Sequence, residues 1–197
     1  MRIGCVLLAA GCSHRFGGNK LLSDFCGQPL AVHAAAALPQ SRFYRTVAVT
    51  QADTRPLLLD CGLECLLNDA PERGISSSIR IGLGALADAD AAMFCVCDQP
   101  LLRPESVERV LDMWLANPSR IVALAFEGVK GNPVVFPRGF FPELAALAGD
   151  RGGSAVIRRH PDALLLCEAG SAAELADADT ALELAALAAT HKNGGKP

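Results

Sequence analysis

Short apolar runs alternate along the chain with longer segments in which apolar residues recur at helical spacing. The short runs have the length of buried strands, and the longer segments are rich in alanine and leucine. This pattern predicts strands at 2–9, 45–50, 64–67, 91–97, 121–126, 133–136 and 163–168. It predicts helices at 29–38, 53–60, 75–87, 104–116, 140–148, 153–160 and 177–190. Such alternation is typical of an α/β protein, and we predict a Rossmann-like three-layer αβα sandwich with a mainly parallel, mixed sheet.

The predicted organisation is a single domain over residues 1–190, because no linker or internal repeat interrupts the alternation. Residues 191–197 are short, polar and glycine-containing, and we expect them to form a disordered tail. In a parallel sheet, ligands gather at the carboxyl ends of the strands. The loops that follow Leu8, Asn68 and Cys97 are therefore expected to share one crevice.

Composition narrows the class of protein. A formal net charge of −3 argues against a broad nucleic-acid-binding face. No apolar run of about 18 residues is present, so no membrane span is expected. The eight cysteines include no Cys-x-x-Cys pair, and the histidines do not cluster with them, which favours reduced thiols in the cytoplasm. Leu8 to Cys12 imitates a lipoprotein signal, but the apolar stretch before it is short for that purpose.

Residues 8–20 form a glycine-rich, basic loop directly after the first predicted strand. Three glycines, Gly11, Gly17 and Gly18, allow main-chain N–H groups to approach a bulky anion, and Arg15 and Lys20 add two cations. The spacing fits neither a Walker loop nor a dinucleotide fingerprint. The segment nevertheless predicts a polyphosphate site.

Asp98 follows the buried run that ends at Cys97, so its carboxylate is expected at the tip of a central strand. Mg²⁺ prefers one or two carboxylates together with phosphate oxygens and water. Beside the glycine-rich loop, Asp98 is a candidate Mg²⁺ ligand. The alternative is that it only ends the strand or caps the following turn.

The motif Leu-Ala-Ala-Gly-x-Ser-x-Arg-Phe-Gly-x-x-Lys at 8–20 resembles the signature loop of the MobA-like NTP transferases, and Cys-Asp-Gln-Pro-Leu-Leu at 97–102 resembles their metal-binding segment. The resemblance extends from Ile3 to about Leu184 and implies a Rossmann-like nucleotidyltransferase fold. It implies catalytic roles for Arg15, Lys20 and Asp98. The nucleotide-binding residues that it implies are Leu8, Ala9, Ala10, Gly11, Cys12, Ser13, Arg15, Phe16, Gly17, Lys20, Asn68, Gly74, Ser76, Ser77 and Ser78.

The same resemblance implies residues for the acceptor and a second metal ligand. The implied acceptor-binding residues are Gln99, Pro100, Asn132, Pro133, Gly152 and Gly153. Asp179 lies in Asp-Ala-Asp-Thr, which resembles the family's Asp-Ile-Asp-Thr-Pro-Glu-Asp ending, with Ala181 in place of the proline. Asp179 is thus the candidate second metal ligand, and capping of the last helix is the alternative.

Within the family, Leu-Ala-Ala-Gly and the 97–102 segment resemble the molybdenum-cofactor cytidylyltransferases more than the guanylyltransferases. This implies Mg²⁺-dependent transfer of CMP from CTP to the terminal phosphate of molybdopterin, giving molybdopterin cytosine dinucleotide and pyrophosphate. It also implies transient contact with a molybdenum hydroxylase or its chaperone. The alternatives are a sugar- or polyol-phosphate nucleotidyltransferase, a guanylyltransferase, and a non-catalytic cofactor carrier.

Overall fold

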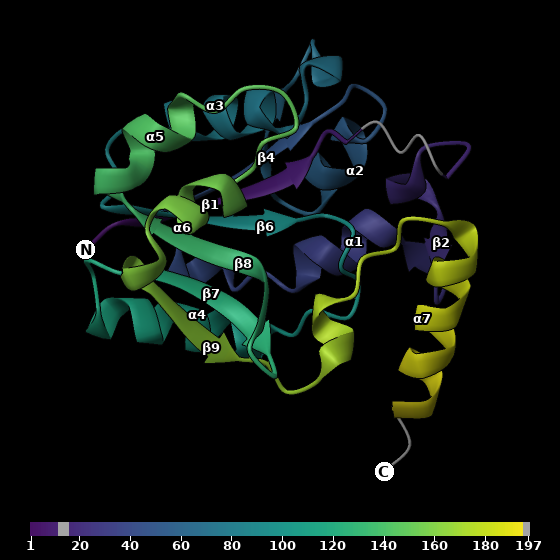
Figure 1. Ribbon diagram of the computed structural model, residues 1–197. Coiled ribbons are helices and arrows are strands. Elements are labelled where there is room, and N and C mark those ends of the chain that lie inside the picture. Colours follow the sequence, from purple (N-terminus) through teal and green to yellow (C-terminus); the bar gives the residue numbers. More distant parts are fainter. Residues whose placement is uncertain (12–15, 195–197) are drawn as a thin grey trace.

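The computed structural model describes residues 1–11 and 16–194, with the side chains of 192–194 excepted. Its centre is a seven-stranded sheet in the described part of the chain, with the order β5-β4-β1-β6-β8-β7-β9 (Figure 1). The strands are β1 (Ile3–Ala9), β4 (Arg45–Thr50), β5 (Glu64–Leu67), β6 (Ala91–Val96), β7 (Ile121–Phe126), β8 (Val129–Pro137) and β9 (Leu164–Glu168). All seven sheet strands were predicted, most of them within one or two residues of their bounds.

One strand of the sheet, β8, runs against the others. It pairs antiparallel with both β6 and β7, whereas β1, β4, β5 and β6 pair in parallel, as do β7 and β9. A hairpin turn at Glu127 and Gly128, both with positive φ, joins β7 to β8. The predicted mainly parallel, mixed sheet is therefore confirmed.

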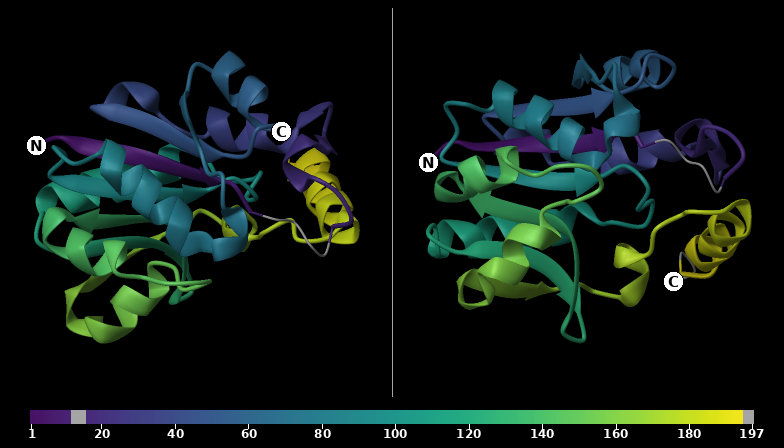
Figure 2. Two further views of the ribbon diagram at one scale, coloured as in Figure 1. Left: turned by 90° about the horizontal axis from the view of Figure 1, so that it is seen from above. Right: turned by 45° about the horizontal axis from the view of Figure 1, so that its top comes forward.

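Helices cover both faces of the sheet and make the three predicted layers (Figure 2). One core joins the sheet to α1 (Leu30–Ala36), α2 (Arg55–Asp60) and α4 (Pro104–Ala116). The other joins it to α3 (Ile75–Ala85), α5 (Phe141–Ala145) and α6 (Ser154–Arg159). None of the helices in the described part of the chain has the length and apolar character that crossing a bilayer requires.

The central strand β1 shows how the apolar pattern builds both cores. Cys5 and Leu7 belong to the core under α1 and α4, and Val6 belongs to the core under α3, because successive side chains of a strand point to opposite faces. A Cβ at Gly82 of α3 would lie 2.5 Å from Cγ1 of Val6. The glycine therefore lets α3 lie close against β1, next to the carboxyl end of that strand.

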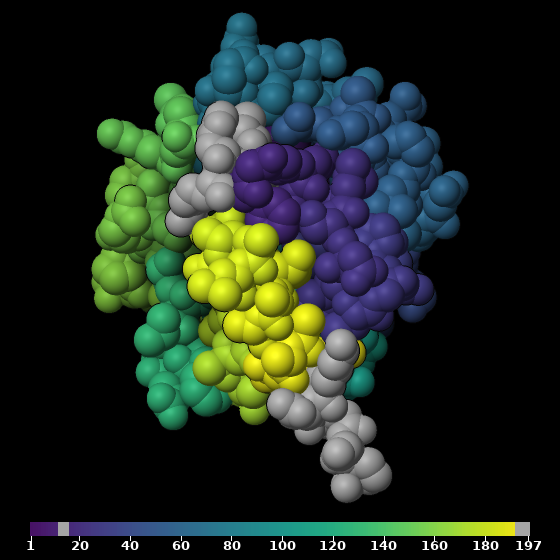
Figure 3. All heavy atoms as spheres, turned by 90° about the vertical axis from the view of Figure 1, so that its right-hand side faces the viewer, coloured from purple at the N-terminus to yellow at the C-terminus, as the bar shows by residue number. Residues whose placement is uncertain are grey.

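Two regions differ from the sequence prediction. A small hairpin of β2 (Asp24–Phe25) and β3 (Gln28–Pro29), turning through the positive-φ residues Cys26 and Gly27, was not predicted. The last helix, α7 (Ala181–Gly194), begins four residues later than predicted and packs beside β2 (Figure 3). It ends at Gly194, and the expected disordered tail at 191–197 stays a prediction. Single turns of 3-10 helix complete the fold: η1 (Lys20–Leu22), η2 (Gln40–Arg42), η3 (Pro71–Arg73), η4 (Arg138–Phe140), η5 (Pro161–Ala163) and η6 (Ala172–Leu175).

Candidate active site

A pocket of about 390 Å³ opens at the carboxyl ends of β1 and β6, where the strand order changes direction. Ligands of open α/β sheets bind at such positions. The pocket is bordered by the loop after β1, the segment after β5, the end of β6 and the approach to α7. Its lining residues are Leu8, Ala10, Gly11, Lys20, Leu21, Pro71, Glu72, Gly74, Ile75, Ser78, Val96, Cys97, Asp98, Asp150 and Asp179. The three loops expected to share one crevice do so.

Lys20 lies between two carboxylates at the floor of this pocket. Its Nζ donates to Oδ2 of Asp98 at 2.7 Å and to Oδ1 of Asp179 at 3.0 Å. The lysine is only 8% exposed. Three sequence-predicted residues, far apart in the chain, thus meet at one point.

The loop that carries Lys20 is anchored by its neighbour, Asn19. The Asn19 side chain donates to Oδ2 of Asp53 at 2.7 Å and to the hydroxyl of Thr54 at 3.0 Å, and its own Oδ1 caps η1 by accepting the N–H of Leu21. This side chain ties the end of the glycine-rich loop to the start of α2. Asn19 therefore fixes the backbone from which the Lys20 side chain extends into the pocket.

Charge explains why a buried lysine is stable here. Burial by itself lowers the pKa of Lys20, but the adjacent carboxylates of Asp98 and Asp179 outweigh that effect and the net pKa is raised. The ammonium remains charged at neutral pH. Because two carboxylates face one ammonium, the cluster carries an excess of negative charge and can accept a further cation.

The residues present fit a divalent cation of the Mg²⁺ type. Oδ1 of Asp98 is buried and has no hydrogen-bond partner among the described residues, so it has free lone pairs. Asp179 supplies a second carboxylate at the same point. No group of three or more histidine, cysteine, aspartate or glutamate residues suited to a metal was found in the ranges described. Two carboxylates without a fuller protein cage are what Mg²⁺ uses when substrate phosphates and water complete its shell.

Asp179 does not cap α7, because Thr180 and Glu183 form that cap. The side chain of Glu183 accepts the N–H groups of Asp179 and Thr180 and the Thr180 hydroxyl, and that hydroxyl in turn accepts the N–H of Glu183. This reciprocal pattern is a capping box with Thr180 as the cap. The cap starts the helix after Asp179, so the side chain of Asp179 reaches Lys20.

The segment between β5 and α3 is organised by Asn68. Its Nδ2 donates to the hydroxyls of Ser77 and Ser78 at 2.8 and 3.0 Å, and its Oδ1 accepts the N–H of Ala70. Asn68 is 5% exposed and does not line the pocket. Of the three serines, Ser78 lines the pocket, while the hydroxyl of Ser76 is buried without a partner in the described residues.

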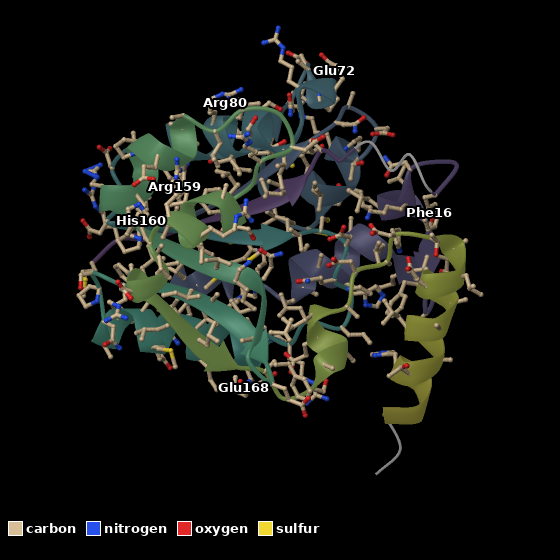
Figure 4. The ribbon with its side chains drawn as sticks, viewed as in Figure 1. Phe16, Glu72, Arg80, Arg159, His160 and Glu168 are labelled. Carbon is tan, nitrogen blue, oxygen red and sulfur yellow. The ribbon has the colours of Figure 1, made fainter. Side chains whose placement is uncertain are left out.

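Gly74 brings two segments of the pocket wall into contact. It has φ of +82°, and a Cβ there would lie 2.4 Å from the carbonyl carbon of Gly149 and 2.5 Å from Oδ1 of Asp150. The N–H of Ser76 also donates to the Gly149 carbonyl at 3.2 Å. Only glycine allows this approach, which places Asp150 at the pocket. Glu72, on the η3 turn at the top of Figure 4, lines the outer part.

The predicted nucleotide loop is described only in part. Leu8, Ala10 and Gly11 line the pocket, whereas Ala9 is buried in the opposite core. Phe16 packs partly buried against that core near α7 (Figure 4). Gly17 has φ of +76° and is not among the lining residues. The remaining predicted loop residues, Cys12, Ser13 and Arg15, lie outside the described residues.

The residues predicted for the acceptor fall into two groups. Gln99 and Pro100 are buried and do not line the pocket. Gln99 directs its amide into the protein, which differs from the predicted contact with an acceptor. The other four residues, Asn132, Pro133, Gly152 and Gly153, belong to β8 and to the segment before α6, and they are not among the lining residues either. Gly152 faces Ile75 of the pocket wall, and Gly153 packs against Phe136.

Two residues, Gln51 and Lys130, were not singled out from the sequence. Gln51 donates to the carbonyls of Ala10 and Gly11 at 3.2 Å and so holds the start of the predicted phosphate loop. Asp150, which begins the Asp-Arg-Gly-Gly run that contains the predicted Gly152 and Gly153, lines the pocket. Lys130 of β8 donates to the Ser154 hydroxyl at 2.8 Å; burial, and then the charge of Arg158, lowers its pKa. The Gly-Val-Lys-Gly-Asn-Pro run was a usable signal for Lys130, because it places a lysine beside the predicted acceptor residue Asn132.

Comparisons with known proteins identify the family of this chain. Residues 5–164 match the family model of the MobA-like NTP transferase domain. A probable molybdenum cofactor guanylyltransferase of Pyrococcus horikoshii is 24% identical over 155 residues, which cover 77% of this chain and 76% of that protein. The purine catabolism protein PucB of Bacillus subtilis is 25% identical over 188 residues, covering 89% of this chain and 90% of PucB.

Solved structures show the same fold. A crystal structure of a Mycobacterium tuberculosis rv0371c homolog from Mycobacterium sp. strain JC1 has a TM-score of 0.82 at 23% identity, covering 98% of this chain and 99% of that one. Rv0371c of Mycobacterium tuberculosis in complex with manganese has a TM-score of 0.77 at 22% identity, covering 96% of this chain and 100% of that one. The predicted α/β nucleotidyltransferase fold is therefore confirmed.

Proposed function

The chain belongs to the MobA-like NTP transferase family, and from that premise we propose that it transfers CMP from CTP to the terminal phosphate of molybdopterin. The products are molybdopterin cytosine dinucleotide and pyrophosphate. An oxygen of the acceptor phosphate attacks the α-phosphorus of CTP, a new P–O bond forms, and the bond to the pyrophosphate leaving group breaks. The nucleophile belongs to the substrate. The protein therefore has to position the two substrates and neutralise the phosphate charge, and no protein side chain has to attack the α-phosphorus.

The observation that carries the proposal is the placement of Lys20 between Asp98 and Asp179 at the pocket floor. A cation next to two carboxylates suits a triphosphate that arrives with its own divalent ion. Lys20 is held by Asn19 and stays charged, so it is ready to bind phosphate oxygens without reorganisation. Arg15 is proposed to add a second positive charge on the triphosphate.

Asp98 and Asp179 are the residues that would hold Mg²⁺. The bound ion would neutralise the phosphate oxygens and the charge that develops on pyrophosphate. The unpartnered buried oxygen of Asp98 supports this role, as does the manganese complex of the structurally similar Rv0371c. Asp98 and Asp179 therefore have a use beyond their contact with Lys20.

The choice of cytidine rests on Leu8 to Gly11. Ala10 lines the pocket, and we propose that its methyl group narrows the base site and so favours a pyrimidine over a larger purine. Gln51 holds the Ala10 carbonyl, so this part of the wall is rigid. GTP is the competing nucleotide, because the Pyrococcus horikoshii relative carries the name of a guanylyltransferase.

The test is a nucleotide and acceptor panel. The protein is incubated with Mg²⁺, molybdenum-loaded molybdopterin and CTP, GTP or ATP, and the dinucleotide formed is identified by mass spectrometry. We expect the cytosine dinucleotide and one pyrophosphate per turnover. Preference for GTP would overturn the choice of base, and turnover only with sugar or polyol phosphates would overturn the choice of acceptor. Failure to release pyrophosphate with every combination would favour a non-catalytic carrier.

A further inference from the structure

The end of β6 is tied to the segment before α7 by the side chain of Gln99. Its Nε2 donates to the Leu175 carbonyl at 3.1 Å and to Oδ1 of Asp177 at 2.9 Å. One main-chain bond runs parallel to this tie, from the N–H of Ala178 to the Asp98 carbonyl at 2.9 Å. Gln99 is 2% exposed, so these bonds are shielded from water.

These hydrogen bonds of Gln99 act on the segment between η6 and α7, which belongs to no helix or strand. The preceding turn, η6, is anchored on α4 by the buried Glu174, which accepts from Ser106, from the N–H of Arg103 at 3.3 Å and from the N–H of Gly170 at 2.9 Å. The following helix begins only at Ala181. Between these two supports, Gln99 bonds to the segment that leads to Asp179.

We propose that Gln99 is a positioning residue that sets Asp179 opposite Asp98 and so builds the two-carboxylate cation site. This inference rests on the proposed function for its metal, although the arrangement of the aspartates is a property of the protein alone. Gln99 touches no substrate in this account. It acts through the 175–179 segment.

The chemistry of the tie requires an amide nitrogen. Both contacts use Nε2 as the donor, while Oε1 of Gln99 has no partner in the part of the chain that the structure describes. Methionine at this position keeps the length of the side chain and removes both donors. Glutamate would set a carboxylate against that of Asp177. Gln99→Met is therefore the informative substitution.

The first readout is Mn²⁺ binding to the nucleotide-free protein. The amount of unbound ion is measured by electron paramagnetic resonance. Loss of an outer-shell partner of a metal site commonly weakens metal binding 10- to 100-fold, so we expect at least a roughly tenfold weaker Kd for Gln99→Met. Arg120→Met is the matched control, because Arg120 also donates to main-chain carbonyls, of Asp162 and Ala163, away from the pocket. That control should bind Mn²⁺ like the wild type.

A second pair of variants keeps the test valid if Gln99→Met does not fold. Asp177→Asn retains an oxygen that can accept from Gln99, whereas Asp177→Ala loses it, and both remove the same charge. We expect Asp177→Ala to bind Mn²⁺ at least about tenfold more weakly than Asp177→Asn, the lower end of the 10- to 100-fold effect of losing an outer-shell partner. Equal affinities of this pair would overturn the inference.

The second readout separates this inference from the proposed function. If the wild type binds no Mn²⁺, the metal role of Asp98 and Asp179 fails, and crystal structures of the metal-free wild type and Gln99→Met decide on Gln99. We expect the Asp179 carboxylate to leave hydrogen-bond distance of Lys20 in Gln99→Met. If Asp179 still contacts Lys20 there, Gln99 does not position it and the inference is wrong.

Discussion

Nζ of Lys20 lies 2.7 Å from Oδ2 of Asp98, although 78 positions separate the two residues in the sequence. Lys20 comes from the loop after β1 and Asp98 from the end of β6, and these strands are hydrogen-bonded neighbours in the sheet. Parallel pairing of β1 with β6 therefore brings the predicted phosphate-binding cation and the predicted metal-binding acid to the same edge.

Asp98→Asn is expected to reduce kcat about 10²- to 10³-fold, the scale seen when one preorganised charged or donor group is removed from an active site. The substitution keeps the shape of the side chain and removes the charge that would hold Mg²⁺. Pyrophosphate release measures the effect. Asp112→Asn is the control, because Asp112 pairs with Arg42 on the surface; a comparable loss in that variant would indicate a general rather than a local effect.

Lys20 is expected to contribute stability that depends on pH. Its pKa in the folded protein is raised above the ordinary lysine value of 10.5, because Asp98 and Asp179 outweigh the effect of burial. The contribution is therefore complete below pH 10.5 and is lost as the pH rises through the folded-state pKa. Urea titration should show that Lys20→Met has a lower free energy of unfolding than the wild type at pH 7–9. This difference should shrink once the pH rises above the folded-state pKa of Lys20. A deficit that stays constant to higher pH would contradict this explanation.

Two glycines at the ends of α3 should respond in opposite directions to alanine. Gly74→Ala forces a Cβ into the backbone of Gly149 at positive φ and is expected to cost about 2–4 kcal/mol, from backbone strain and overpacking together. Gly84→Ala meets nothing within 4 Å and should stabilise the helix by about 0.5–1 kcal/mol. Chemical denaturation measures both. A neutral Gly74→Ala would mean that the 149–150 segment moves freely.

Lys130 is expected to serve the acceptor rather than the nucleotide. It lies in β8 two residues before Asn132, and no ion pair of Lys130 with a carboxylate is present among the described residues. Its positive charge is therefore available to an anionic acceptor. Lys130→Met should raise KM for molybdopterin roughly tenfold, as expected for loss of one charge-assisted hydrogen bond, and leave KM for CTP within twofold. A larger effect on CTP would place Lys130 on the nucleotide side.

The elements of the sandwich could be predicted because their signal is local. Strands such as β1 and β6 are uninterrupted apolar runs, and a helix such as α4 repeats its apolar residues at helical spacing, with Val107, Val110, Leu111 and Trp114 all buried. A central strand is buried on both faces, so nearly all of its residues have to be apolar. The small β2–β3 hairpin was missed, since two-residue strands have no periodicity to detect.

The candidate site was only partly visible in the sequence. Lys20 and Asp98 stand out because each follows a predicted strand and has a residue type suited to phosphate or metal. Asp179 could equally have been a helix cap, and only the Thr180–Glu183 capping box decided that Asp179 faces Lys20. Gln99 was expected to face the acceptor, yet its amide faces Asp177.

The sequence by itself determined which segments become buried strands and helices, and which residues could bind phosphate or metal. It did so because the apolar pattern of a segment and the chemical type of each residue can both be read from a short stretch of the chain. The tertiary structure alone decided that Asp98 and Asp179 meet across Lys20 and that Gln99 is hydrogen-bonded to the segment before Asp179. Such contacts depend on strand order and on hydrogen bonds between residues that lie 78 to 159 positions apart in the sequence, and no local pattern encodes them.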